Sequence, residues 1–214
     1  MRSFRELILV LAVSGTALLL GSRSGNALEN RAVCSDNLRK IYQVASAYSN
    51  DNDGMIVPIY NLRGVKKQTF WPELLLDYVN DFSIYYCPDD SSGKKNLKKH
   101  DLLPMKFSIS NVSYGLNYFI SKTKKGPNAE NPYNIRRVAD PGYVIYFGDA
   151  RFVHLRPTKW CWEGDYNPVH SGGSNFVMAD GHVEYFKGKT LGVYHEFNGW
   201  KQDIKRWKNW KKSI

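Results

Sequence analysis

An apolar run followed by an amphipathic stripe occupies the first quarter of the chain. Residues 7–21 are apolar over 15 positions, with Arg2 and Arg5 before them and Arg23 behind. Further on, apolar residues recur at steps of four and three, the spacing of one helix face: Cys34, Leu38, Ile41, Ala45 and Tyr48. The stretch "NDNDG" (50–54) then supplies a C-terminal stop. The sequence therefore predicts an amphipathic scaffold helix over residues 28–54.

Residues 1–27 form a separate N-terminal segment with two interpretations. A helix of 15 residues spans about 22 Å, less than the hydrocarbon core of a bilayer, which is about 30 Å thick. One interpretation is a secretory signal peptide, with "GNA" ending at Ala27 as the cleavage site. The other is a retained membrane anchor, centred on Leu7 to Leu20, whose helix continues into the body. Both interpretations place the folded part outside the cytoplasm.

Residues 55–199 are predicted to form a β-rich globular domain. Aromatic and β-branched runs bounded by turn residues are typical of strands. Three such runs are "FSIYYCPDD" (82–90), "SYGLNYFIS" (113–121) and "GYVIYFGDA" (142–150), whereas "FWPELLLDYV" (70–79) is predicted to be a short helix. The predicted fold class is therefore α+β, with the long N-terminal helix packed on an antiparallel sheet.

The stretch 176–186 predicts a hairpin. An Asp-Gly step between apolar runs favours a two-residue type I′ turn at Asp180 and Gly181, which requires positive φ at both positions. That turn would pair Ala179 with His182 and place four side chains on one apolar face: Phe176, Met178, Val183 and Tyr185. On this interpretation Asp180 serves backbone geometry.

The same region contains side chains that can bind a metal. His170, Asp180 and His182, with Asp149 or His154, have the ligand types of a zinc or first-row metal site. No local spacing brings them to one point, so we predict no metal, no cofactor and no catalytic residue. His170 is expected to bond the backbone of the "HSGGSN" loop. The expected fold-defining positions are His170, Asp180 and Gly181.

The chain also has three cysteines and a positive net charge. Cys34, Cys87 and Cys161 are candidates for a disulfide outside the cytoplasm, and an odd number leaves at least one unpaired. The net charge is +10, and residues 200–214 read as a basic amphipathic helix rich in Trp and Lys. This helix can dock on the domain, lie on an anionic membrane or contact an acidic polymer. Nucleic acid is not an expected partner.

Several of these segments resemble one protein family. His170, nine intervening residues and then Asp180-Gly181 match the His-x-nine-Asp-Gly signature of prepilin-type proteins abundant in planctomycete-like bacteria. "CSDNLRKIYQVASAYSNDNDG" (34–54) is similar to that family's Cys-x-x-Asn-Leu helix and Asn-Asp-Gly turn. "YYCPDD", "SYGLNYFI", "VADPGYVIYFGDA" and "NFVMADGHVEYF" follow in the family's order, so the resemblance covers residues 28–187.

The resemblance implies a pseudopilin or type IV pilin-like subunit without catalytic activity. Its N-terminal helix would be half membrane anchor and half scaffold for an antiparallel sheet. It would be held in the inner membrane facing the periplasm or exterior, and would assemble with itself or other pseudopilins in a type II secretion-like filament. Two alternatives remain. One is a secreted binding module for acidic polymers or glycans, and the other is a metal-dependent enzyme using His170, Asp149, Asp180 and His182.

Overall fold

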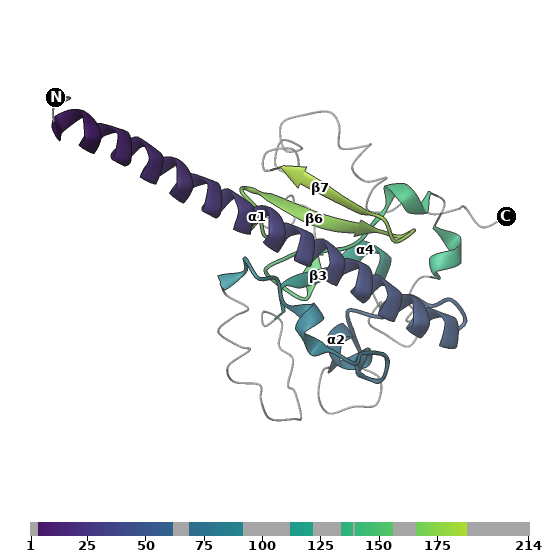
Figure 1. Ribbon diagram of the computed structural model, residues 1–214. Helices are drawn as coiled ribbons and strands as arrows, with labels where there is room; N and C mark the ends of the chain where they lie inside the picture. Colours follow the sequence, from purple (N-terminus) through teal and green to yellow (C-terminus); the bar gives the residue numbers. More distant parts are fainter. Residues whose placement is uncertain are drawn as a thin grey trace.

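A computed structural model describes residues 4–61, 69–91, 112–121, 134–138, 140–155 and 166–187, and the side chains of the first helix from residue 26 onward. One long N-terminal helix lies across a five-stranded, mostly antiparallel sheet (Figure 1). The predicted α+β fold is therefore confirmed. Residues 200–214, where a basic helix was predicted, lie outside the described residues.

Helix α1 runs from Phe4 to Asp51 and is the backbone of the architecture. The side chains of the predicted stripe are buried at Cys34, Leu38, Ile41 and Ala45 and half-buried at Tyr48, which confirms it. The helix ends as "NDNDG" predicts. Asp53 adopts a φ of +54° and the Gly54 N–H donates to the Ser49 carbonyl at 2.7 Å, the bond of a Schellman cap. The helix has no break between residues 27 and 28.

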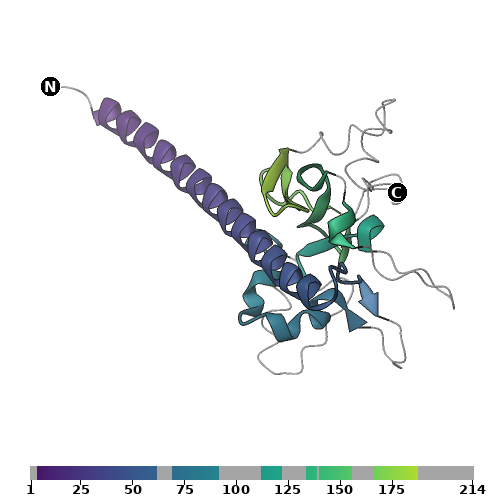
Figure 2. The ribbon, with the colours of Figure 1, turned by 90° about the vertical axis from the view of Figure 1, so that its right-hand side faces the viewer.

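The first half of α1 extends away from the body in both views (Figures 1 and 2). Among the helices whose side chains the structure describes, none is long and apolar enough to cross a membrane. The predicted anchor, Leu7 to Leu20, lies before residue 26 and so outside that part of the chain.

The main sheet has the order β5-β3-β4-β6-β7. Its neighbours are antiparallel except for β3 and β5, which are parallel. The bounds are β3 Tyr114–Asn117, β4 Ile145–Asp149, β5 His154–Leu155, β6 Gly173–Met178 and β7 Val183–Lys187. A separate two-stranded sheet pairs β1 (Tyr60–Asn61) with β2 (Thr69–Phe70).

Short helices connect these strands. They are α2 (Trp71–Leu74), η1 (Leu76–Tyr78), η2 (Phe82–Tyr85), α4 (Tyr118–Ser121), η3 (Ile135–Arg137) and η4 (Pro141–Tyr143). Thus "FWPELLLDYV" forms a helical turn and a 3-10 turn rather than one helix.

The strand predicted for "FSIYYCPDD" is wrong, because η2 is a 3-10 helix. The Asp81 side chain starts it by accepting the Ser83 N–H at 2.9 Å, a local bond that competes with strand pairing. This segment delivers Cys87 to the interior.

The hairpin exists, but its predicted register is wrong by one residue. Val177 pairs with Val183 and Phe176 with Glu184. The Met178 N–H donates to the His182 carbonyl at 2.8 Å and the Gly181 N–H to the Met178 carbonyl at 2.9 Å. The loop therefore has three residues, with positive φ only at Gly181 (+95°), as in a turn followed by a glycine bulge.

The shifted register separates the residues that were predicted to share one face. Val177 and Val183 belong to the core under α1, whereas Phe176 and Met178 pack on the opposite side of the sheet with Ile145. Strand β6 is buried on both faces. This two-sided burial fixes the register strongly, because a slip of one residue would exchange the two sets.

Candidate functional site

Four side chains from distant segments meet beneath α1. Cys34 comes from the middle of α1, Cys87 follows η2, Asp149 ends β4 and His170 precedes β6. All four are buried, and each offers one ligand atom within 4.8 Å of the other three. We call these four residues the buried cluster.

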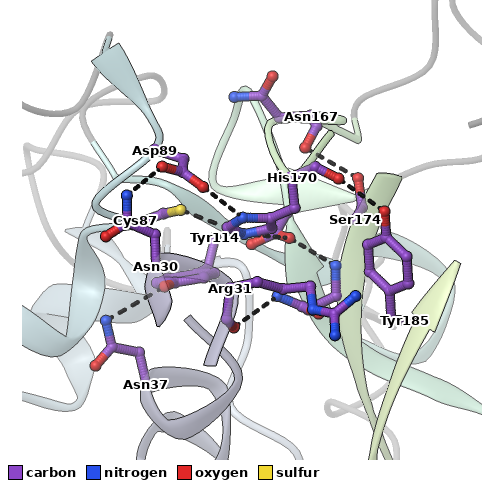
Figure 3. Close-up of polar contacts among 12 residues, drawn as sticks. Asn30, Arg31, Asn37, Cys87, Asp89, Tyr114, Asn167, His170, Ser174 and Tyr185 are labelled. Carbon is purple, nitrogen blue, oxygen red and sulfur yellow. Dashed lines mark hydrogen bonds and ion pairs between the residues drawn. The ribbon is translucent and has the colours of Figure 1, made fainter. Parts of the chain in front are cut away.

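The turn before β6 aims the His170 ring into the cluster. His170 and Gly173 exchange two backbone hydrogen bonds of 3.0 Å across Ser171 and Gly172, which have φ of +52° and +80°. The two-residue turn with two positive φ values therefore occurs here rather than at Asp180. Tyr185 of β7 reinforces it, since its hydroxyl donates to the His170 carbonyl at 2.7 Å (Figure 3).

Both nitrogens of the His170 ring have acidic neighbours. Nδ1 lies 2.9 Å from Asp89 Oδ2, while Nε2 lies 3.3 Å from Asp149 Oδ2 and 3.5 Å from Cys87 Sγ (Figure 3). His170 therefore makes the expected loop contacts through its main chain and not through its ring. Its ring bonds to carboxylates and a thiol.

The charges of this group are strongly coupled. Burial lowers the pKa of His170, but its hydrogen bonds with Asp149 and Cys87 outweigh burial and raise that pKa to about 10. Burial raises the pKa of Asp149, against the opposing effect of His170. The shared proton belongs on His170, because Asp149 Oδ2 also accepts the Asn175 N–H at 2.6 Å, a bond that favours the carboxylate.

The Cys87 thiol has the opposite tendency, toward its neutral form. A hydrogen bond with Cys34, together with burial, raises the pKa of Cys87 far above its ordinary value, and the hydrogen bond with His170 only partly opposes this. Cys87 is therefore a neutral thiol at physiological pH in this arrangement. A buried neutral thiol is a poor nucleophile.

A polar network fastens α1 around the cluster. Asn30 donates to Asp89 Oδ1 at 2.6 Å (Figure 3), and Asn37 donates to the Tyr86 carbonyl at 3.1 Å. The Arg31 carbonyl accepts from Asn175 Nδ2 at 3.3 Å, and its guanidinium carbon lies 4.6 Å from the centre of the Tyr185 ring, a cation–π distance.

The residues considered as metal ligands from the sequence lie in separate places in the structure. Asp149 and His170 come together, but Asp180 and His182 lie beyond the other end of β6, whose six residues span about 20 Å. His182 lies at that tip, with Nδ1 2.6 Å from Asp180 Oδ1 and Nε2 3.0 Å from Glu184 Oε1. The combined site with Asp180 and His182 is therefore wrong. His154 lies on β5 and is not among the four cluster residues.

The structure describes two of the three cysteines. Cys34 and Cys87 are buried and form no disulfide with each other, and Cys161 lies outside the described residues. Reasoning from the sequence missed that Asp89 and the two cysteines join His170, because their spacings follow no local motif. The proline turn after Cys87 was a local signal that the chain changes direction before Asp89.

Compared with protein-family models, curated proteins and solved structures, the chain matches none.

Proposed function

We propose that this protein is a non-catalytic, pilin-like structural subunit. Its N-terminal helix would anchor it in the inner membrane and hold the body on the periplasmic or outer side. The observation that carries this proposal is the continuity of α1, which joins the apolar segment to the stripe that packs on the sheet. A cleavable signal peptide has no need of such a rigid connection.

The length of α1 fits both tasks. Its 48 residues measure about 72 Å at 1.5 Å per residue. Among the side chains that the structure describes, polar contacts of α1 with the body begin at Asn30 and Arg31. The helix before Asn30 is therefore about 39 Å long, longer than a hydrocarbon core of about 30 Å, and its apolar run at residues 7–21 accounts for about 22 Å of that length.

The order of sequence elements supports the same class. The signature residues lie at the two ends of β6, with His170 before the strand and Asp180-Gly181 after it. His170 ties the strand to α1 through the cluster, and Gly181 packs against Tyr42 of α1. Both ends of the signature thus hold the sheet to the scaffold helix, which gives these residues a structural reason for their types.

The buried cluster does not favour an enzyme. Cys34, Cys87, Asp149 and His170 each have side chains that are at most 2% exposed. A catalytic metal site needs a position open to substrate, and these residues lie under the helix. We therefore propose a role in assembly, with a type II secretion-like filament as the setting.

The test is the N-terminus and location of the full chain, made in a Gram-negative host. Membrane and soluble fractions are separated, extracted with alkaline carbonate and analysed by intact mass. We expect the protein in the membrane fraction, starting at Met1 or Phe4, where Phe4 identifies prepilin-type processing. A soluble protein starting at Leu28 would refute the anchor and leave the secreted binding module.

Two arginine substitutions on α1 provide a matched pair. Val13→Arg lies at the centre of the apolar segment, where an arginine costs about 3 kcal/mol on insertion. It should move the protein out of the carbonate-resistant fraction. Val33→Arg, at a position 42% exposed on the same helix, should stay membrane-bound. Equal behaviour of the two variants would contradict the proposal.

A further inference from the structure

We infer that Cys34, Cys87, Asp149 and His170 form a structural zinc site. This inference is independent of the proposed function, because it concerns how the body is held together and not where it resides. It rests on donor chemistry, on spacing, on an unmatched buried oxygen and on the surroundings of the histidine.

The donor set suits zinc. Two thiolates, an imidazole and a carboxylate give four ligands from the types that zinc accepts. The sulfur donors disfavour magnesium and calcium, which prefer oxygen, and the nitrogen and oxygen donors disfavour an iron–sulfur cluster. All four residues are buried, so the site would be closed, which is typical of structural zinc.

The spacing agrees with tetrahedral coordination. Zinc bond lengths of about 2.3 Å to sulfur and about 2.0 Å to nitrogen or oxygen set edges of about 3.6 Å for S···N and about 3.3 Å for N···O. Cys87 Sγ lies 3.5 Å from His170 Nε2, and that nitrogen lies 3.3 Å from Asp149 Oδ2. Cys34 Sγ joins within the 4.8 Å limit that all four ligand atoms share.

Asp149 provides a separate reason to expect a cation. The residue is fully buried, and its Oδ1 atom has no hydrogen-bond partner among the described residues. A buried carboxylate oxygen without a donor is costly. A divalent ion at the centre of the cluster would neutralise this carboxylate directly.

The surroundings of His170 are those of a metal ligand. Its Nε2 faces the cluster, while its Nδ1 bonds to Asp89 at 2.9 Å, and Asp89 is held in turn by Asn30 at 2.6 Å (Figure 3). A carboxylate on the outer nitrogen fixes the tautomer and the ring orientation of zinc-binding histidines. Here the outer carboxylate is itself attached to α1.

Binding has a defined proton balance. Zinc displaces one proton from each thiol of Cys34 and Cys87 and the proton on His170 Nε2, and these protons go to solvent. The Nδ1 proton stays in the bond to Asp89. The ion then joins α1, the η2 segment, β4 and the turn before β6, four segments that are far apart in the sequence, so its binding energy becomes folding energy.

The first experiment measures metal in the full chain purified without chelator. We expect one zinc per chain by elemental mass spectrometry. X-ray absorption should show two sulfur ligands at about 2.3 Å and two nitrogen or oxygen ligands at about 2.0 Å. Cobalt replacement should give the visible bands of a tetrahedral site and thiolate-to-cobalt charge transfer. These wild-type readouts do not depend on any variant folding.

Variants then locate the site. Cys87→Ser should weaken zinc binding at least 100-fold and remove part of the charge-transfer band. Asp89→Ala should weaken binding about 10- to 100-fold without changing the number of sulfur ligands. His182→Ala is the matched control, because that half-exposed histidine also lies between two carboxylates. It should bind zinc as tightly as the wild type, and so should Cys161→Ser.

Stability supplies an independent measurement. Removing zinc by chelation should lower the melting temperature of the wild type, and free zinc at about 1,000 times the Kd should raise it by roughly 10 °C. His182→Ala should respond equally. The proposal is overturned by a Cys34–Cys87 disulfide in the purified protein, by failure of the reduced protein to bind zinc, or by zinc that Cys87→Ser retains.

Discussion

Gly181, the last residue of the β6–β7 loop, provides a sharp test of how the hairpin is fixed to α1. Its φ is +95°, and a Cβ added there would lie 2.6 Å from Tyr42 Cε1. Gly172 has a similar φ of +80°, but no described atom lies within 4 Å of a Cβ built on it. The two glycines therefore share a backbone requirement and differ in their space.

Alanine substitution separates these effects. Gly172→Ala should cost about 1–2 kcal/mol, the penalty of a left-handed residue with a side chain. Gly181→Ala adds overpacking of about 1–3 kcal/mol, for a total of roughly 2–5 kcal/mol. Tyr42 cannot move aside without loss, because its ring packs edge-on against Tyr146 at 6.1 Å.

The assay is reversible unfolding followed by tryptophan fluorescence in both variants, repeated with Tyr42→Leu in the background. In that background the excess cost of Gly181→Ala over Gly172→Ala should largely disappear, leaving a coupling energy above about 1 kcal/mol. Equal losses for the two glycines, or an excess that persists without the Tyr42 ring, would refute the account of the hairpin contact.

Two other predictions address the scaffold helix and the hairpin tip. Leu38→Ala, at a fully buried position of α1, should lower the free energy of unfolding by about 2–5 kcal/mol. Val33→Ala, on the exposed face of the same helix, should change it by less than about 0.5 kcal/mol. Denaturant titration measures both losses, and equal losses would contradict the burial of this helix face. The hydrogen bond with Glu184 raises the pKa of His182 against the lowering effect of burial, and Asp180 raises it further. The resulting stabilisation is complete below the unfolded pKa of about 6.5 and is lost as the pH rises through the folded pKa. An NMR titration should therefore show a raised pKa that Glu184→Gln lowers, and an unchanged value would contradict the geometry.

Local periodicity was sufficient to predict the scaffold helix. The stripe from Cys34 to Tyr48 repeats over four turns, and its C-terminal stop has a definite chemistry in Asp53 and Gly54. Such signals depend only on residues close in the sequence, so tertiary contacts do not change them. Helix α1 runs without a break from Phe4 to Asp51. It therefore continues through the segment boundary that composition had indicated after Ala27.

The hairpin register could not be read in the same way. "MADGHV" allows both a two-residue turn and a three-residue loop, since each places Gly181 at a positive φ. The choice depends on tertiary contacts: Tyr42 against the glycine, and burial of β6 on both faces. The prediction assumed one apolar face and one exposed face, which led to the wrong pairing.

The buried cluster shows a different limit. His170 and Asp149 were recognised as having the right chemistry, but they were grouped with Asp180 and His182 because these were close in sequence. Cys87 was assigned to a strand, although the Asp81 cap on Ser83 instead forms a 3-10 turn that leads it inward. Only the folded chain brings α1, η2 and β4 to the same histidine.

The position of the cluster connects the two proposals without making one depend on the other. It lies where α1 passes from the sheet to its extending half, and Asn30 and Arg31 are the first residues with described side chains that bond to the body there. A force along the helix would act first on these bonds, and the contact between Asp89 and His170 connects them to the cluster. Hydrogen bonds of this kind yield individually, whereas a metal joining Cys34 to three other segments would resist as one unit. A subunit that is held by its helix in a membrane or a filament would need such a joint at this place.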